Sequence, residues 1–122
     1  LHLSIRRQRQ MCIRDSLYNI KRLHNLFPDK EIFITENGIA TDDDDERIEF
    51  VSDVLKDIHQ YLDSNSKVIG YLYWSLLDNF EWDLGYQMNF GLVEVDKSTY
   101  ERKPHNSAKW FGEISSTNIF SY

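Results

Sequence analysis

The sequence predicts an α/β fold, because two strands of the buried type flank one amphipathic helix. Residues 32–35 and residues 68–77 are apolar at nearly every position instead of every second one, which is typical of parallel strands buried on both faces. Between them lies an apolar stripe at spacings of three and four, formed by Ile48, Val51, Leu55, Ile58 and Leu62. This spacing predicts a helix over residues 48–62. Strand, helix and strand in this order predict two parallel strands joined by a right-handed crossover.

Further elements are expected on both sides of this unit. Residues 17–27 carry apolar side chains near helical spacing and are followed by Pro28, and a last helix is expected after Pro104. Residues 92–95 have the composition of a short strand, whereas residues 78–91 are aromatic and irregular.

The five acids at positions 42–46 are interpreted as the start of the central helix. The helix macrodipole favours negative charge at that end. A calcium loop would need alternating ligands and a central glycine, which this run lacks. No metal site is therefore expected.

Two parallel strands cannot bury both of their faces without neighbours. A (β/α)₈ barrel supplies such neighbours and takes about 250 residues, about twice the 122 residues of this chain. We therefore expect residues 17–114 to be the C-terminal quarter of such a barrel. Residues 115–122 show no clear element and are expected to form a loose tail.

The first sixteen residues differ in charge from the rest. They hold four of the fourteen basic residues and a single acid. Their apolar start precedes the charges, which is the reverse of a signal peptide. The segment resembles translated adapter sequence, so residues 1–16 are expected to be a foreign or disordered leader; a native basic arm is the alternative.

Composition excludes several classes of partner. The net charge is −6 and no basic stripe alternates with aromatic residues, so nucleic acid is not an expected partner. No apolar run approaches eighteen residues, so no membrane span is expected. Cys12 is the single cysteine, which excludes an internal disulfide and fits a reducing compartment such as the cytoplasm.

Acidic and aromatic residues follow both predicted strands. Glu36 ends the first strand, and residues at the C-terminal ends of barrel strands face the active site. A carboxylate there can act as nucleophile, acid or base; a surface Glu that opens a turn is the alternative. At the end of the second strand and just beyond it, residues 74–82 hold two Trp and two acids, a set that binds sugars through stacking and hydroxyl contacts. Trp74 as core and Asp78 as a loop anchor are the alternatives.

These segments resemble motifs of glycoside hydrolase family 1. Residues 34–38 read Ile-Thr-Glu-Asn-Gly, like the nucleophile motif of that family. Residues 74–82 read Trp-Ser-Leu-Leu-Asp-Asn-Phe-Glu-Trp, like its glycone-binding segment, and residues 90–93 and 107–110 continue the match. The resemblance covers about residues 17–114.

The resemblance implies hydrolysis of terminal β-linked glucosyl or galactosyl residues with retention of configuration. It implies Glu36 as the nucleophile and Trp74 as the indole that stacks on the glycone. Glu81 would take the O4 and O6 hydroxyls, Trp82 would donate near O3, and Phe90 would lie beside the O6 end. The substrate would be a small β-glycoside or oligosaccharide, and neither a metal nor an organic cofactor is implied.

The second catalytic carboxyl of the family lies in an Asn-Glu-Pro motif on an earlier strand, and no such motif occurs here. The chain is therefore expected to be inactive alone and to need the N-terminal part of the same barrel as its partner. It also departs from the family at Val54, Asn65, Asn89 and His105. Phospho-sugar members carry Ser and Lys in place of Glu81 and Met88, so a sugar 6-phosphate is disfavoured.

A non-catalytic carbohydrate-binding module that uses Trp74 and Trp82 is the competing hypothesis. Such modules are mostly β-sandwiches with many short alternating strands, a pattern that this sequence lacks. A structural domain without a ligand is a third reading, but it leaves Glu36 and Glu81 unexplained.

Overall fold

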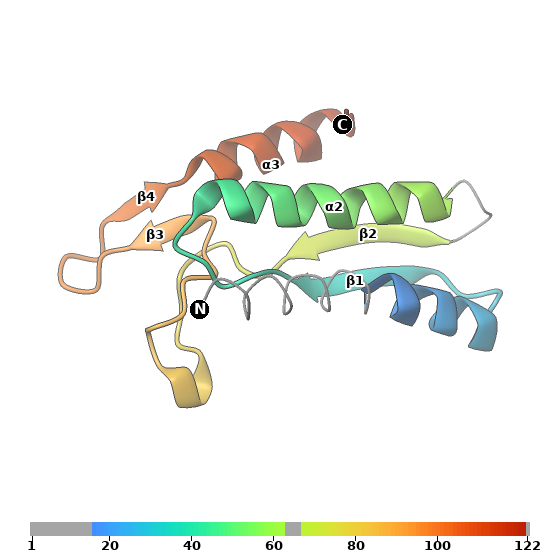
Figure 1. Ribbon diagram of the computed structural model, residues 1–122, viewed down its shortest axis with the longest axis horizontal. Helices are drawn as coiled ribbons and strands as arrows, with labels where there is room; N and C mark the ends of the chain where they lie inside the picture. Colours follow the sequence, from blue (N-terminus) through green and yellow to red (C-terminus); the bar gives the residue numbers. More distant parts are fainter. Residues whose placement is uncertain (1–15, 63–66, 122) are drawn as a thin grey trace. The chain divides into compact units, whose positions relative to one another are not determined.

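The computed structural model describes residues 16–62 and 67–121. The first fifteen residues of the predicted leader (residues 1–16) and Asn65 therefore lie outside the described residues. Residues 16–26 are helical. The elements that follow are β1 (Ile32–Asn37), α2 (Asp44–Leu62), β2 (Val68–Tyr73), the 3₁₀ turn η1 (Trp82–Leu84), β3 (Val93–Val95), β4 (Arg102–Pro104) and α3 (Asn106–Thr117), as Figure 1 shows. The predicted alternation of helices and strands is confirmed.

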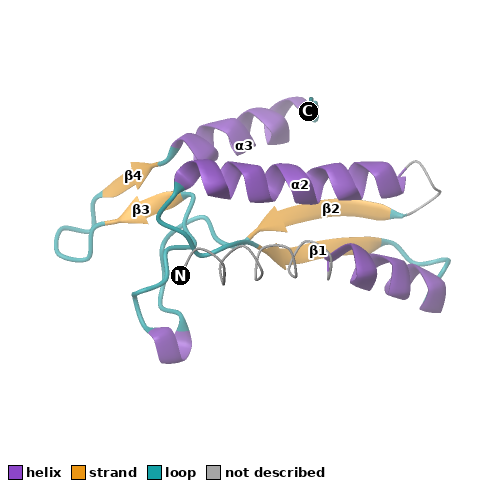
Figure 2. Cartoon of the chain, in the orientation of Figure 1, coloured by secondary structure: helices purple, strands orange, loops and turns teal. Residues whose placement is uncertain are grey.

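β1 and β2 form a two-stranded parallel sheet, as predicted. The amide of Ile32 donates to the carbonyl of Lys67 at 2.8 Å, and the amide of Trp74 donates to the carbonyl of Asn37 at 2.9 Å. The residue numbers of the hydrogen-bonded partners increase in the same direction along both strands, as in parallel pairing. The strands point the same way in Figure 2, and α2 connects them.

β2 ends at Tyr73, four residues before the predicted end at Leu77. The next apolar residues pair elsewhere: Leu77 forms a parallel bridge with Val93, and the amide of Val93 donates to the carbonyl of Leu76 at 3.0 Å. Apolar composition alone could not separate these two pairings.

β3 and β4 form an antiparallel hairpin with Val93 opposite Pro104. The sequence predicted β3 but not β4, because β4 reads Arg-Lys-Pro and is exposed throughout. α3 continues to Thr117 and closes with Asn118 in the left-handed region, whose amide donates to the carbonyl of Ile114. Residues 115–117, expected in a loose tail, are therefore helical.

The described chain divides into two compact units. The first unit holds residues 16–35, 50–62 and 67–72, and the second holds residues 36–49 and 73–121. The N-terminal six residues of α2 belong to the second unit and the remainder to the first. No helix of the described residues has the length and apolar character needed to cross a membrane.

Apolar side chains fill the interior of the first unit. Its buried residues are Ile20, Phe50, Val51, Val54 and Ile58. The predicted stripe of α2 was therefore partly wrong, since Phe50 and Val54 are buried while Leu62 is 41% exposed. α2 carries apolar residues over a wide arc, and periodicity cannot say which part of that arc meets a neighbour.

The sheet of the first unit keeps apolar surface in solvent, although burial on both faces was expected. Phe33, Ile69 and Leu72 are each about half exposed. The ring of Phe33 lies directly over Gly70, where a Cβ would stand 2.2 Å from a ring carbon. Gly70 thus leaves the space that the ring fills.

Candidate active site

Glu36 is the penultimate residue of β1 and its side chain is exposed. The chain just after it is fixed against the end of β2. Trp74 donates its amide to the Asn37 carbonyl at 2.9 Å, and a Cβ at Gly38 would stand 1.8 Å from the Trp74 carbonyl oxygen. Only glycine tolerates so close an approach. Because β1 and β2 are parallel neighbours, Glu36 and Trp74 lie at the same edge of the sheet.

Trp74 and Glu81 are brought together directly. The indole Nε1 of Trp74 donates to Oε1 of Glu81 at 3.2 Å. Glu81 is placed by a tight loop, because its amide donates to the Gly85 carbonyl at 2.7 Å and its carbonyl accepts from Leu84 at 2.8 Å. The indole of Trp74 and the carboxylate of Glu81, which both come after β2, therefore form one cluster. Trp74 in this cluster is 38% exposed.

Trp82 and Phe90 take no part in the hydrogen bond between Trp74 and Glu81. Trp82 begins η1 with φ at 43°, a backbone region that most side chains avoid, and it is 85% exposed. Phe90 is half-buried. Within the described part of the chain, the side chains of Glu36 and Trp82 make no hydrogen bond, so the structure does not join them to the Trp74–Glu81 pair.

The loop after β2 is held by polar side chains, of which the sequence analysis considered Asp78 alone as an anchor. Ser75 is buried, accepts from Asn79 Nδ2 at 2.8 Å and donates to the Leu77 carbonyl at 2.8 Å. Asp78 accepts the Gly91 amide at 2.8 Å, so it serves as the loop anchor that was its alternative reading. Asn and Asp after a strand are a signal for such anchors.

The acidic run lies at the start of α2, as predicted, and it also caps the helix. Asp44, Asp45 and Glu46 lie in its first turn. Asp43 Oδ1 accepts the amides of Asp45 at 3.0 Å and Glu46 at 3.4 Å, which is N-capping. The interpretation of this run as a helix start is confirmed.

Asp44 and Arg47 form an ion pair in the interior of the second unit. Arg47 is 1% exposed and its Nη1 donates to Asp44 Oδ1 at 2.8 Å. Asp44 also accepts the amide and hydroxyl of Ser107 in α3, at 2.9 and 2.6 Å. Burial raises the pKa of Asp44, but the bonds from Ser107 and Arg47 outweigh it and hold the pKa below its ordinary value.

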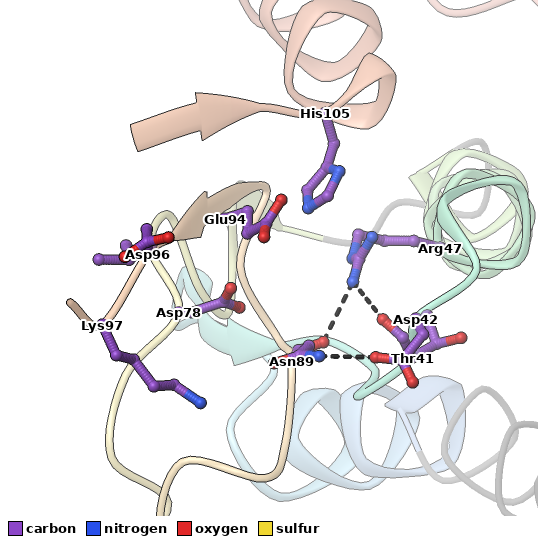
Figure 3. Close-up of a pocket in the computed structure, with 10 residues that line it drawn as sticks. Thr41, Asp42, Arg47, Asp78, Asn89, Glu94, Asp96, Lys97 and His105 are labelled. Carbon is purple, nitrogen blue, oxygen red and sulfur yellow. Dashed lines mark hydrogen bonds between the residues drawn. The ribbon is translucent and has the colours of Figure 1, made fainter. Parts of the chain in front are cut away.

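A cavity of about 430 Å³ opens beside this pair in the second unit. Figure 3 shows Arg47, Asn89, Glu94 and His105 around it. None of the five predicted sugar-site residues lines it. Among the described residues there is no group of side chains suited to hold a metal ion.

A carboxylate and an indole thus lie at the C-terminal ends of two parallel strands, and the indole N–H donates to a second carboxylate. The model of the family described as "Glycosyl hydrolase family 1" matches residues 5–120, and the chain belongs to that family.

Solved structures agree with this membership. The family 1 β-glucosidase from Thermotoga maritima is similar with a TM-score of 0.83 and 32% identity over 87% of this chain. The GH1 β-glucosidase from Exiguobacterium antarcticum B7 is similar with a TM-score of 0.80 and 38% identity over 86% of this chain. The chain spans only 26% and 25% of the lengths of these proteins.

Proposed function

We propose that this chain is the C-terminal part of a (β/α)₈ barrel that hydrolyses terminal β-linked glucosyl or galactosyl residues with retention of configuration. One observation carries the proposal. The parallel pairing of β1 and β2 puts Glu36 and Trp74 at the same end of the sheet, and Trp74 is hydrogen-bonded to Glu81. In barrels of this kind that end is the active-site face.

In the proposed reaction, the Glu36 carboxylate attacks the anomeric carbon. A covalent glycosyl-enzyme forms as the bond to the leaving oxygen breaks, and a second carboxyl protonates that oxygen. Water then hydrolyses the intermediate, with the second carboxyl taking the proton from the water. Retaining enzymes hold the two carboxyl groups about 5–5.5 Å apart. The second group would come from the N-terminal part of the barrel.

The sugar would be held by Trp74, Glu81, Trp82 and Phe90. The Trp74 N–H donates a hydrogen bond to Oε1 of Glu81. This bond would orient the indole, and Oε2 of Glu81 would accept sugar hydroxyls. A Glu81 carboxylate would also repel a 6-phosphate. The Thermotoga maritima β-glucosidase is known in complex with deoxynojirimycin and with galacto-hydroximolactam, which supports a sugar-sized ligand without separating glucose from galactose.

The N-terminal part of the same barrel is the proposed partner of this chain. Phe33, Ile69 and Leu72 are about half exposed on the sheet, and exposed apolar surface of this kind marks an interface. The 122-residue chain should therefore hydrolyse no nitrophenyl β-glucoside above a Glu36→Gln chain. Turnover above that control would contradict the requirement for a second part.

The catalytic assignment is tested in the complete protein that carries this chain. Glu36→Gln should lower kcat by roughly 10⁴-fold or more, as loss of a nucleophile does. Glu31→Gln makes the same change at an exposed carboxylate before β1 and should leave kcat unchanged. In Glu36→Gly, added azide should restore cleavage and give the α-glycosyl azide. Equal effects of the two Gln variants would refute Glu36 as nucleophile.

A carbohydrate-binding module is the second candidate, and the 85% exposure of Trp82 favours it. It would bind soluble β-glucan through Trp74 and Trp82 without cleaving it. In that case Trp82→Ala abolishes binding while Glu36→Gln does not change it, and the complete protein turns over no glycoside.

A further inference from the structure

Asn89 makes two hydrogen bonds with the loop between β1 and α2, and a third with Arg47 of α2. Its carbonyl accepts from the Thr41 amide at 3.1 Å and from Arg47 Nη2 at 3.1 Å. Its side-chain Nδ2 donates to Asp42 Oδ1 at 2.6 Å. Figure 3 shows the guanidinium reaching from α2 to Asn89. Residues 87–91 have no regular secondary structure, so bonds of this kind determine where the segment lies.

The next carbonyl, that of Phe90, is held by the end of β2. It accepts from the Tyr73 hydroxyl at 3.0 Å and from the Ser75 amide at 3.4 Å. The ring of Tyr73 packs against Phe111 with 6.4 Å between centroids. Burial raises the pKa of Tyr73, so the phenol stays protonated and can donate. Two successive carbonyls are thus fixed by two donors each.

Arg47 cannot move away from Asn89 without breaking other bonds. Its Nη2 also donates to the Thr41 carbonyl at 2.6 Å, and its Nη1 is paired with Asp44. Asp44 is in turn bonded to the buried Ser107. A buried cation that loses its partners carries a large desolvation penalty, so moving Arg47 away from Asn89 would cost free energy.

We propose that Tyr73 and Arg47 are positioning residues for Phe90. They set the main chain of the residue whose ring is assigned to the O6 end of the sugar, and the proposal rests on the function proposed above. Neither side chain is among the residues assigned to the sugar. Their effect should therefore depend on whether the substrate has an O6 group, whereas a merely structural role would affect every substrate alike.

The test compares two nitrophenyl glycosides in the complete protein: the β-glucoside, and the β-xyloside, which lacks the C6 hydroxymethyl group. Tyr73→Phe removes one hydroxyl and keeps the ring on Phe111. It should lower kcat/KM for the glucoside about fivefold more than for the xyloside, as loss of one hydrogen bond predicts. Tyr100→Phe, the same change at a 71% exposed tyrosine, should change neither. Arg47→Lys, which keeps the charge and loses the fork of donors, should act like Tyr73→Phe.

Hydrogen exchange of residues 88–92 gives a readout that is independent of turnover. Exchange should become faster in Tyr73→Phe and stay unchanged in Tyr100→Phe. An equal loss for both glycosides, or unchanged exchange, overturns the proposal. Faster exchange in a protein that cleaves neither glycoside supports the positioning of Phe90 and refutes the proposed function instead.

Discussion

The two units of the chain have different interiors. In the first unit the buried side chains are apolar, from Ile20 and from the α2 residues Phe50, Val51, Val54 and Ile58. In the second unit the buried side chains include a cation and two hydroxyls. These are Arg47, Ser75 and Ser107, with Leu92 the buried apolar residue among those described.

This difference follows what each unit has to do. Apolar burial is strong but non-directional, so it holds a helix on a sheet without fixing individual atoms. Hydrogen bonds add little net stability but have defined directions. The residues proposed to bind sugar all belong to the second unit, where direction matters more than strength.

The largest effect is expected from Phe50→Ala. Phe50 is 0% exposed, and removal of a buried phenyl ring costs about 3–5 kcal/mol in the free energy of unfolding. Phe27→Ala, in the same unit but 55% exposed, is the matched control and should cost much less. Urea unfolding of the chain measures both, and equal costs would mean that apolar packing does not hold this unit.

Asp44→Ala tests the polar interior of the second unit. The change leaves Arg47 buried without its ion pair and Ser107 without its acceptor, which should cost about 3 kcal/mol. Asp45→Ala, at an exposed acid in the same helical turn, should cost less than about 1 kcal/mol. Similar unfolding midpoints for the two variants would show that the Asp44 bonds do not stabilise the unit.

Acid should affect the two units in opposite directions. The pKa of Asp44 is lowered on folding, so its contribution is present above the ordinary pKa of 3.8 and is lost as pH falls through the folded value. Burial, followed by repulsion from Asp53, raises the pKa of Asp57 in the first unit, so its contribution is present below 3.8 and is lost as pH rises through the folded value.

Exchange protection of each unit, followed between about pH 6 and pH 2, separates these two effects. Asp44→Asn should reduce the loss of stability that acid causes in the second unit, where the pKa of Asp96 is also lowered. Asp57→Asn should remove the gain of stability in the first unit. Acid curves for both units that coincide in the unmutated chain would contradict the assignment.

The smallest effect is expected at the N-cap of α2. Asp43→Ala removes the acceptor for the amides of Asp45 and Glu46 and should cost about 1 kcal/mol. Asp43→Asn keeps a capping oxygen and should be nearly neutral. Circular dichroism of thermal unfolding distinguishes the two, and an equal loss in both would assign the effect to charge instead of capping.

The sequence predicted those parts of the fold that local patterns encode. The consecutive apolar residues of β1 and β2 and the acids at the start of α2 needed no partner elsewhere in the chain to be recognised. The buried arc of α2 and the bond from Arg47 to Asn89, 42 positions away, depend on tertiary neighbours. A local pattern carries no information about such distant pairs.

The candidate site divides in the same way. The position of Glu36 at the end of the first strand followed from the sequence pattern and is seen in the structure. The position of Trp74 just after β2 did not, because the predicted strand continued to Leu77. The bond between Trp74 and Glu81 did not, because a loop conformation decides it. The roles of all five residues toward sugar stay predictions: Glu36, Trp74, Glu81, Trp82 and Phe90.

The bond between Asp44 and Ser107 has a consequence for the order of folding. It joins positions 63 residues apart, and closing a chain loop of that length costs entropy that only the finished structure returns. We expect this hydrogen bond to form late in the folding reaction, after β1, α2 and β2 have packed together. Ser107→Ala should then speed unfolding while leaving the folding rate nearly unchanged. The hydrogen bond would thus delay the opening of the second unit once that unit has folded.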